Sequence, residues 1–400
     1  MMHTVARLSE ADVLVKPSPV AMVWNEPDRP LEALAVPGIH LSAGEALVEI
    51  ELATVCGSDV HTVLGHRSAS TPLVLGHEQV GRVVALGPDA VRSDGSSLEL
   101  GDRVVWSVTV SCGECDRCVR GLTQKCRSLA KYGHERVHRG WELSGGFATH
   151  VQLRAGTATV RIDEGVPAAV AAPASCATAT AVAALDAASD RVDLAGAVVL
   201  VTGGGMIGLS AAAIAVEAGA IVVVSEPDAG RRAFARRFGA HAVDPRARVG
   251  APDRLDAVLA ALTGGGAAGA APVGMPRDAP REVLVAVEAS GTSAGVRTAV
   301  STVGTGGVVV LVGSVAGGTE LCVDPESIVR RMLTVTGVHN YAATHLERAV
   351  AFLERSWRIL PLDELVGPTH ALAMLDLALA EAASGEHIRV GVAPGRRAAT

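Results

Sequence analysis

The stretch AVVLVTGGGMIGLSAAAIAVEAGAIVVVSEPD, from Ala197 to Asp228, contains the pattern that predicts the fold. It consists of an apolar run, a group of glycines, an Ala-rich segment and a second apolar run, which is the order strand, turn, helix, strand. Gly203, Gly205 and Gly208 have the spacing G-x-G-x-x-G at the turn. Because glycines let the backbone approach a pyrophosphate closely at a helix N-terminus, the stretch predicts a dinucleotide-binding unit.

The residue that follows the second strand indicates which dinucleotide binds. Glu226 stands eighteen residues after Gly208, where a carboxylate binds both ribose hydroxyls of NAD and repels the additional phosphate of NADP. Arg231 and Arg232 follow closely and would instead suit that phosphate, so NADP is the alternative to NAD. The residues expected at the cofactor site are Gly203, Gly205, Met206, Ile207, Gly208, Glu226 and Arg231.

Further apolar runs extend the pattern along the chain. EVLVAVEASG, GGVVVLVG and LTVTGVH predict more strands, and strands that alternate with helical segments indicate a doubly wound parallel sheet. The first third instead alternates β-rich runs (EALVEIELATV, GRVVALG and GDRVVWSV) with glycine turns, which predicts a largely β domain. The last sixty residues return to a mixed pattern that ends in the strand-like EHIRVGVAP. A chain of 400 residues is expected to form two domains.

Composition argues against several classes of function. Aromatic residues make up 2% of the chain and the net charge is −7, so neither stacking platforms nor a basic surface favours binding of nucleic acid. With so few aromatic residues, the core is expected to pack from aliphatic side chains. The N-terminus has no apolar run of signal-peptide length, and the apolar stretch 168–188 is interrupted by Pro173 and Asp186, which argues against a membrane span. We therefore expect a cytoplasmic protein with a small-molecule substrate and no membrane partner.

Three scattered residues are candidate metal ligands. In a reducing compartment, cysteines indicate metal binding or catalysis rather than disulfides. Cys56, His77 and Cys176 would supply two thiolates and an imidazole, a set that leaves the fourth tetrahedral position open, as a catalytic zinc ion requires. Taken singly, a buried cysteine is more often an inert small side chain, and this is what we expect of Cys322.

Four further cysteines are clustered in SCGECDRCVRGLTQKC, with the spacing Cys112-x2-Cys115-x2-Cys118-x7-Cys126. A disulfide pair is disfavoured by the compartment. A ferredoxin-type iron–sulfur run would need its fourth cysteine after three residues and then a proline, whereas here the gap is seven and Arg127 follows. Four thiolates around one tetrahedral zinc ion fit a closed structural site. Such a site has no position for a substrate, so we expect it to stabilise the loop without taking part in turnover.

The motifs CGSDVH, GHEQVGRVVALG, GDRVV, the cysteine cluster, GGFATHV and GGGMIG follow one another along nearly the whole chain. In this order they resemble the zinc-dependent medium-chain alcohol dehydrogenases. The resemblance implies a GroES-like catalytic domain at residues 1–180, with a structural-zinc lobe at about 111–127, and a Rossmann domain at 181–340. Residues 341–400 would return to the catalytic domain. It also implies two zinc ions per subunit and a homodimer or homotetramer.

The resemblance also implies roles for individual residues. Cys56, His77 and Cys176 would hold the catalytic zinc ion, with Glu78 beside the metal as an occasional exchange ligand. Asp59 would orient the ligand histidine. Ser58 and His61 would carry the proton of the substrate hydroxyl toward solvent. The implied reaction is hydride transfer between an alcohol and NAD, reversible to the aldehyde or ketone.

A narrower resemblance concerns the substrate. SLAKYGHE, LSGGFATHVQL, AAPASCATATAVAAL and TGVHNYA are similar to a branch of the family associated with phosphonate metabolism, which implies a phosphonate-bearing hydroxyalkyl substrate. Lys131, His134 and Arg67 are the residues expected to bind the anionic group, unless they form only a solvated basic loop. The competing functions are a general secondary-alcohol or polyol dehydrogenase without anionic preference, a zinc-free quinone reductase, and a non-catalytic NAD-binding or structural protein.

Overall fold

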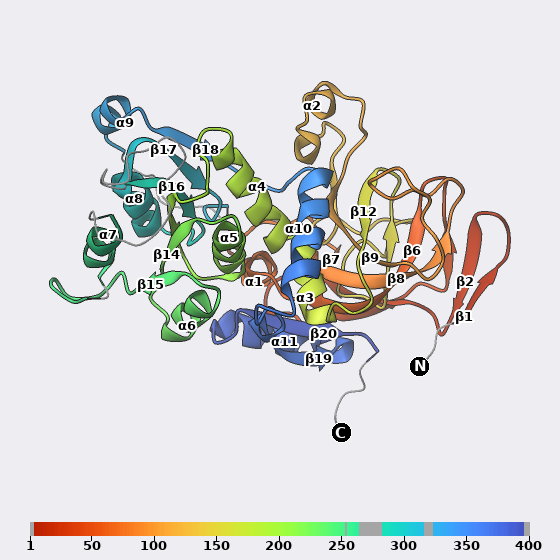
Figure 1. Cartoon of the computed structure of the whole chain (residues 1–400). Helices are drawn as coiled ribbons and strands as arrows, with labels where there is room; N and C mark the ends of the chain where they lie inside the picture. The colour runs from red at the N-terminus through yellow and green to blue at the C-terminus, as the bar shows by residue number, and fades with distance from the viewer. Residues whose placement is uncertain (1–3, 253, 264–281, 316–322, 396–400) are drawn as a thin grey trace. The chain divides into compact units, whose positions relative to one another are not determined.

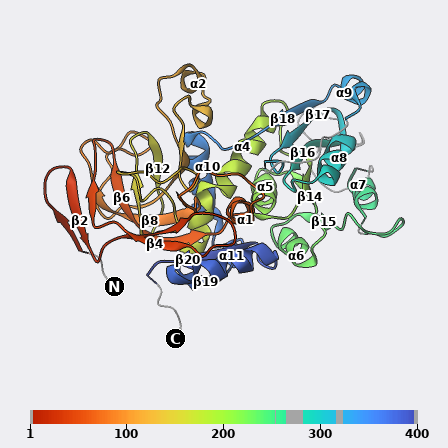
Figure 2. The ribbon, with the colours of Figure 1, turned by 180° about the vertical axis from the view of Figure 1, so that it is seen from behind.

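The computed structural model describes residues 4–252, 254–263, 282–315 and 323–395, and Cys322 lies outside the described residues. The chain divides into two compact units. The β-rich unit consists of Met1–Ala179 and Asn340–Thr400, and the parallel-sheet unit consists of Thr180–His339. Figures 1 and 2 show the elements of each unit from opposite sides.

The parallel-sheet unit begins with the strand, turn, helix and strand that the sequence predicts. Its sheet has the order β15-β14-β13-β16-β17-β18, and every neighbouring pair is parallel. Most strand residues are Val or Ala with both faces covered, as is usual in parallel sheets. The strands are β13 (Val198–Thr202), β14 (Ile221–Ser225), β15 (His241–Val243), β16 (Val283–Glu288), β17 (Val303–Leu311) and β18 (Thr334–Gly337).

The strand order of this sheet indicates where a ligand would bind. The chain passes from β13 to β14 on one side, and β16 lies on the other side of β13. Loops that diverge at the carboxyl ends of such strands leave the crevice in which doubly wound sheets bind ligands. The helices of the unit are α5 (Met206–Glu217), α6 (Ala229–Arg237), α7 (Leu255–Thr263), α8 (Ser293–Thr302) and α9 (Pro325–Arg331).

The β-rich unit is built around an eight-stranded sheet with the order β10-β9-β8-β6-β20-β19, to which β11 and β12 add by pairing with β6 and β9. The C-terminal strand β20 pairs antiparallel with β6. The strands are β6 (Ala46–Thr54), β8 (Gln79–Leu86), β9 (Arg103–Val110), β10 (Ala130–Lys131), β11 (His150–Leu153), β12 (Thr157–Arg161), β19 (Val366–Ala371) and β20 (Arg389–Ala393).

Two smaller sheets complete this unit, with the orders β1-β2-β5 and β4-β3-β7. Their strands are β1 (Thr4–Arg7), β2 (Asp12–Lys16), β3 (Val20–Trp24), β4 (Glu32–Ala35), β5 (Gly38–His40) and β7 (Leu73–Val74). The helices and 3-10 turns are α1 (Gly57–Val63), α2 (Asp116–Val119), η1 (Thr123–Lys125), α3 (Ala168–Ala171), η2 (Ala172–Ser175), α10 (Ala343–Ser356), η3 (Asp363–Leu365), η4 (Leu372–Met374) and α11 (Leu375–Ser384). Helix α4 (Ala177–Ser189) runs across the boundary between the two units.

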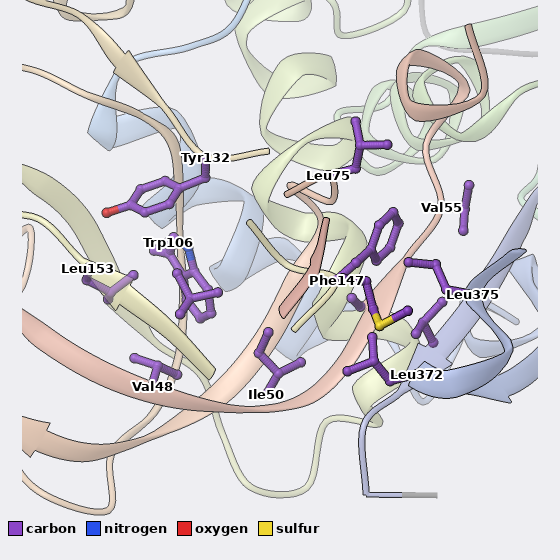
Figure 3. Packing of buried hydrophobic residues seen from close by; sticks show 14 of the residues in the cluster. Val48, Ile50, Val55, Leu75, Trp106, Tyr132, Phe147, Leu153, Leu372 and Leu375 are labelled. Atoms are coloured by element: carbon purple, nitrogen blue, oxygen red, sulfur yellow. The ribbon is translucent and has the colours of Figure 1, made fainter. Parts of the chain in front are cut away.

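The core of the β-rich unit is largely aliphatic, as expected, but it also contains five of the chain's ten aromatic residues, including Trp24 and Trp141. Trp106, Tyr132 and Phe147 are fully buried and belong to one cluster with Ile50 and Leu375 (Figure 3). Because a buried aromatic side chain removes a large apolar area from water, the five aromatic residues contribute strongly to this one core. The low aromatic content therefore does not make the core uniformly aliphatic.

No single helix among the described residues is long and apolar enough to cross a membrane. The pair Ala168–Ser175 and Ala177–Ser189 reaches the required length and hydropathy only together, and it is bent by 53°.

Candidate functional site

Cys56, His77 and Cys176 are far apart in the sequence and come together in the β-rich unit. Cys56 precedes α1, His77 precedes β8, and Cys176 lies at the break between η2 and α4. Their ligand atoms all lie within 4.8 Å of one another, with His77 buried and the thiols half-buried. Two thiols and one imidazole suit zinc and leave a fourth position for another ligand. These three residues, the Cys₂His cluster, therefore fit a catalytic zinc ion.

Asp59 lies buried beside the ring of His77. Its buried carboxylate accepts hydrogen bonds from the backbone N–H of Cys56 at 2.9 Å and of Gly76 at 3.3 Å. Asp59 Oδ1 lies 3.5 Å from His77 Nδ1, an electrostatic contact longer than a good hydrogen bond. Burial disfavours the imidazolium, but the charge and hydrogen bonding of Asp59 and Cys56 together outweigh burial and raise the pKa of His77 well above its usual value. With Nδ1 facing the carboxylate, Nε2 is the nitrogen left for a metal.

A buried ion pair lies against Cys56. Arg389 donates from Nε to Glu78 Oε2 at 2.7 Å and from a terminal nitrogen to Oε1 at 2.9 Å. Thr54 Oγ1 donates to Glu78 Oε2 at 2.7 Å. Arg389 also lies 3.7 Å from Cys56 Sγ. A hydrogen bond from Cys176 lowers the pKa of Cys56 well below its usual value, and the Arg389 charge acts in the same direction.

Ser58 and His61 lie on α1, three residues apart, and residues at this spacing lie on the same side of a helix. Ser58 Oγ is 3.3 Å from His77 Nε2, so its hydroxyl stands next to the Cys₂His cluster. His61 is exposed. The helix thus presents a hydroxyl to the cluster and a histidine to solvent.

Arg67, Lys131 and His134, which we call the basic group, lie near the Cys₂His cluster. The ring of His134 has its centroid 4.7 Å from that of His77. Burial lowers the pKa of His134 well below its usual value, and the charges of His77, Arg67 and Lys131 lower it further. Burial also lowers the pKa of Lys131, with the charges of Lys125 and Arg67 adding to it. The ring contact places His134 beside His77, and the charges of Arg67 and Lys131 act on this same histidine.

The four clustered cysteines gather in one lobe around α2, which projects from the β-rich unit (Figures 1 and 2). The Sγ atoms of Cys112, Cys115, Cys118 and Cys126 lie within 4.8 Å of one another, and all four thiols are free. The backbone N–H of Cys112 is the main cause that lowers the pKa of Cys126 to about 6, which favours the thiolate that a metal needs. We call this group the Cys₄ lobe; its donor set fits one tetrahedral zinc ion.

The glycine turn lies between β13 and α5 in the parallel-sheet unit. Gly203 has a φ of 99°, and a Cβ on Gly208 would stand 1.9 Å from the carbonyl O of Gly203. Met206 and Ile207 form the first turn of α5. The turn therefore has the close backbone packing that a dinucleotide-binding motif requires.

Glu226 follows β14 and lies beside this turn. Its carboxylate accepts hydrogen bonds from the backbone N–H of Gly204 at 2.6 Å and of Asp228 at 2.8 Å. Arg231 lies in the first turn of α6, where its backbone N–H is capped by the Asp228 carboxylate. Arg232 donates to the carbonyl O of Glu226 and lies 3.3 Å from a carboxylate oxygen of Asp244. The charge of Arg232 is thus partly neutralised by Asp244, whereas the buried carboxylate of Glu226 is held at the glycine turn.

Sequence reasoning missed Arg389, Thr54 and Tyr341. Arg389 begins the apolar strand RVGVA, and a charged residue in a buried strand indicates a buried partner. Tyr341 is one of only two tyrosines in the chain and is 2% exposed. Nothing in the local sequence shows which groups these side chains contact.

Comparison with known proteins assigns the family. Residues 42–164 match the alcohol dehydrogenase GroES-like domain, and residues 206–355 match the zinc-binding dehydrogenase family. The L-threonine 3-dehydrogenase of Anaeromyxobacter sp. (strain K) is 32% identical over 335 residues, which cover 82% of this chain and 83% of that protein. The chain belongs to the zinc-dependent medium-chain dehydrogenase family.

Further relatives of this medium-chain dehydrogenase agree. The L-galactonate-5-dehydrogenase of Escherichia coli (strain K12) is 31% identical over 83% of this chain and 84% of its own length. The alcohol dehydrogenase of Thermotoga maritima has 27% identity and a TM-score of 0.82, covering 94% of this chain and 99% of that one. A zinc-binding dehydrogenase of Sinorhizobium meliloti 1021 bound to NADP has 26% identity and a TM-score of 0.76, covering 95% and 100%. The fold class expected from the sequence, GroES-like plus Rossmann, is confirmed.

Proposed function

We propose that this medium-chain dehydrogenase transfers a hydride between NAD and an alcohol that carries an anionic group, with a phosphonate-bearing hydroxyalkyl compound as the expected substrate. The observation that carries the proposal is the position of the basic group, Arg67, Lys131 and His134, beside the Cys₂His cluster. The relatives named for L-threonine and L-galactonate lend support, because both compounds carry a carboxylate.

The charges of the basic group support an anionic ligand. Among the residues that the structure describes, no ion pair joins Arg67 or Lys131 to a carboxylate. The charge of Glu135 raises the pKa of Lys131, but the hydrogen bond between these residues joins a Glu135 carboxylate oxygen to the backbone N–H of Lys131, at 3.1 Å, and not to its ammonium group. Half-buried cations without a paired carboxylate are costly, and charge-assisted hydrogen bonds to a phosphonate or carboxylate would offset that cost.

The Cys₂His cluster would hold zinc, which when bound acts as a Lewis acid and favours ionisation of the substrate hydroxyl. Ser58, whose Oγ lies beside the cluster, would accept the proton of the substrate hydroxyl while its own proton moves on, and the exposed His61 would release a proton to solvent. Glu78 is held by Arg389 and Thr54, so it would serve as an exchange ligand only after leaving both partners. Asp59 would keep the imidazole of His77 oriented toward the metal.

NAD is the proposed cofactor, with NADP as the alternative. Glu226 lies beside the glycine turn, where its carboxylate would oppose the additional phosphate of NADP. Arg232 is engaged by Asp244, which makes it a weaker receptor for that phosphate. The Sinorhizobium meliloti relative was solved with NADP, so a titration with both cofactors is required.

The remaining assignments follow from the family. Residues 1–180 and 341–400 would form the catalytic domain, and residues 181–340 would bind the cofactor. The Cys₄ lobe would hold a second, structural zinc ion. A homodimer or homotetramer in the cytoplasm is proposed, and the free thiols of both clusters are in keeping with a reducing compartment.

The test compares matched alcohols with the holoenzyme. We expect 2-hydroxypropylphosphonate or 3-hydroxybutyrate to give a higher kcat/KM than neutral 2-butanol or 2,3-butanediol. Lys131→Ala should lower kcat/KM for the anionic alcohols by about tenfold or more, the usual scale of a lost charge-assisted hydrogen bond, and leave the neutral alcohols nearly unchanged.

Arg136→Ala is the matched control, because Arg136 is an exposed cation in the same segment. It should leave both classes of substrate unaffected. Equal losses for anionic and neutral alcohols in Lys131→Ala would contradict the anionic preference, and a higher kcat/KM for neutral diols would favour a general polyol dehydrogenase. Tight NAD binding without turnover of any alcohol would indicate a non-catalytic protein.

A further inference from the structure

Tyr341 is buried where three segments of the β-rich unit meet. Its side chain is 2% exposed. The hydroxyl accepts a hydrogen bond from the backbone N–H of Val108 at 3.4 Å and donates one to the carbonyl O of Ser175. Val108 belongs to β9, and Ser175 directly precedes Cys176. One phenol therefore joins the main sheet to the residue before a proposed metal ligand.

Ser175 also contacts the second ligand segment. Its Oγ donates to the carbonyl O of His77 at 3.2 Å, and Ser175 is fully buried. Hydrogen bonds thus run without interruption from Val108 through Tyr341 and Ser175 to His77. Two of the three ligands in the Cys₂His cluster are reached by this path.

The backbone at Cys176 explains why Ser175 needs an outside donor. Helical residues Ala168–Ser175 and Ala177–Ser189 meet at an angle of 53°, and Cys176 between them has φ −130° and ψ −73°, outside the helical range. Carbonyls in the last turn of a helix have no donor within that helix. The Tyr341 hydroxyl supplies one to Ser175.

We propose that Tyr341 is a positioning residue of the catalytic metal centre, whose hydroxyl fixes the Ser175 carbonyl and so holds the Cys176 thiol in place relative to His77. This inference rests on the proposed function, because it assumes that the Cys₂His cluster binds zinc. Removal of the hydroxyl leaves two buried backbone groups without this partner. Loss of a group that orients metal ligands typically costs about 10–100-fold in metal affinity.

The test is Tyr341→Phe, which keeps the ring and removes only the hydroxyl. Zinc transfer from the purified holoenzyme to a chromogenic chelator is followed in time, and a Co²⁺-substituted sample reports the ligand geometry by its visible absorption. We expect one zinc ion to leave about tenfold faster than in the wild type and the cobalt bands of the Cys₂His cluster to shift. Release from the Cys₄ lobe should be unchanged.

Tyr132→Phe is the matched control. Tyr132 is the other tyrosine of the chain, is fully buried, and has its hydroxyl 2.7 Å from Thr157 Oγ1 and 2.8 Å from the backbone N of Arg154. The same loss of a buried hydroxyl there should leave zinc release and the cobalt spectrum as in the wild type. Ser175→Ala removes the hydrogen bond to the His77 carbonyl and should also accelerate zinc release. It is the test variant to use if Tyr341→Phe does not fold.

Wild-type rates and an unchanged cobalt spectrum in Tyr341→Phe, or in Ser175→Ala where that variant is used, would overturn the inference. Equal acceleration in Tyr132→Phe would also overturn it, because the effect would then be general loss of stability. If the wild type holds no zinc in the Cys₂His cluster, the proposed function fails together with this inference. If the wild type does hold zinc there and the variants release it at the wild-type rate, the inference alone is wrong.

Discussion

Glu78 and Arg389 are charged residues that the fold buries together, with Glu78 fully buried and Arg389 9% exposed. Removing two charges from water costs several kcal/mol, and such a pair is stable only when its geometry is good and its remaining lone pairs are satisfied. Here the contact is bidentate, and Thr54 supplies a further hydrogen bond. Either partner alone would be an uncompensated buried charge.

We therefore expect Arg389→Met to lower the free energy of unfolding by about 3–5 kcal/mol, measured by urea denaturation. The double variant Arg389→Met with Glu78→Gln should recover most of the loss, because no charge then stays unpaired. Arg82→Met is the control: its ion pair with Glu164 is exposed, so the change should cost about 1 kcal/mol or less. Equal losses for the two single variants would show that burial of the Glu78–Arg389 pair has no special cost.

The glycines in the turn between β13 and α5 are required for two different reasons. At Gly208 a side chain would collide with the carbonyl O of Gly203, and Gly203 itself has a positive φ that other residues rarely adopt. At Gly205 a Cβ would meet nothing within 4 Å. Gly203 and Gly208 are needed by the turn itself, whereas the space beside Gly205 is available to a ligand.

This difference predicts opposite behaviour of two alanine variants. Gly208→Ala should lower the melting temperature and weaken cofactor binding together, because the turn must shift to relieve the collision. Gly205→Ala should keep the melting temperature within about 2 °C and still weaken NADH binding about tenfold by obstructing the pyrophosphate. Thermal unfolding and fluorescence titration measure the two effects. Wild-type affinity in Gly205→Ala would place the pyrophosphate elsewhere.

At the scale of the whole molecule, the two candidate metal-ligand groups and the glycine turn belong to different units. The Cys₂His cluster and the Cys₄ lobe lie within Met1–Ala179, whereas Gly203–Gly208 lies within Thr180–His339. Each unit has hydrophobic clusters of its own. Metal and cofactor should therefore stabilise separate parts of the chain.

Hydrogen exchange followed by mass spectrometry tests this separation. Chelator treatment of the zinc-loaded protein should increase exchange around residues 55–60, 111–127 and 175–177, because these segments would lose their metal cross-links. Addition of NADH should instead protect residues 198–228. If the chelator increased hydrogen exchange in β13 and β14 as strongly as in the Cys₄ lobe, the two units would not be stabilised independently.

Some features follow from local sequence. The Val-rich strands and the helix after the glycine turn were predictable because each depends on periodicity and spacing within a few residues of one another. The alternation of strands with helices also indicated a doubly wound sheet, whereas the pairing of β13 with β16 joins residues far apart in the chain. The Cys₄ lobe belongs to this class, since its four thiols lie within fifteen residues. Wherever the deciding contacts lie close in sequence, the sequence alone determined the structure.

Tertiary structure decided the rest. Cys56, His77 and Cys176 meet only because the segments that precede α1 and β8 and follow η2 come together in the fold. The sequence pattern proposed these residues as candidates without placing them. The contact of Arg389 with Glu78 spans 311 residues and depends on the pairing of β20 with β6. Tyr341 reaches Ser175 across 166 residues. Such contacts depend on which segments pair and at what register, and no local periodicity encodes that.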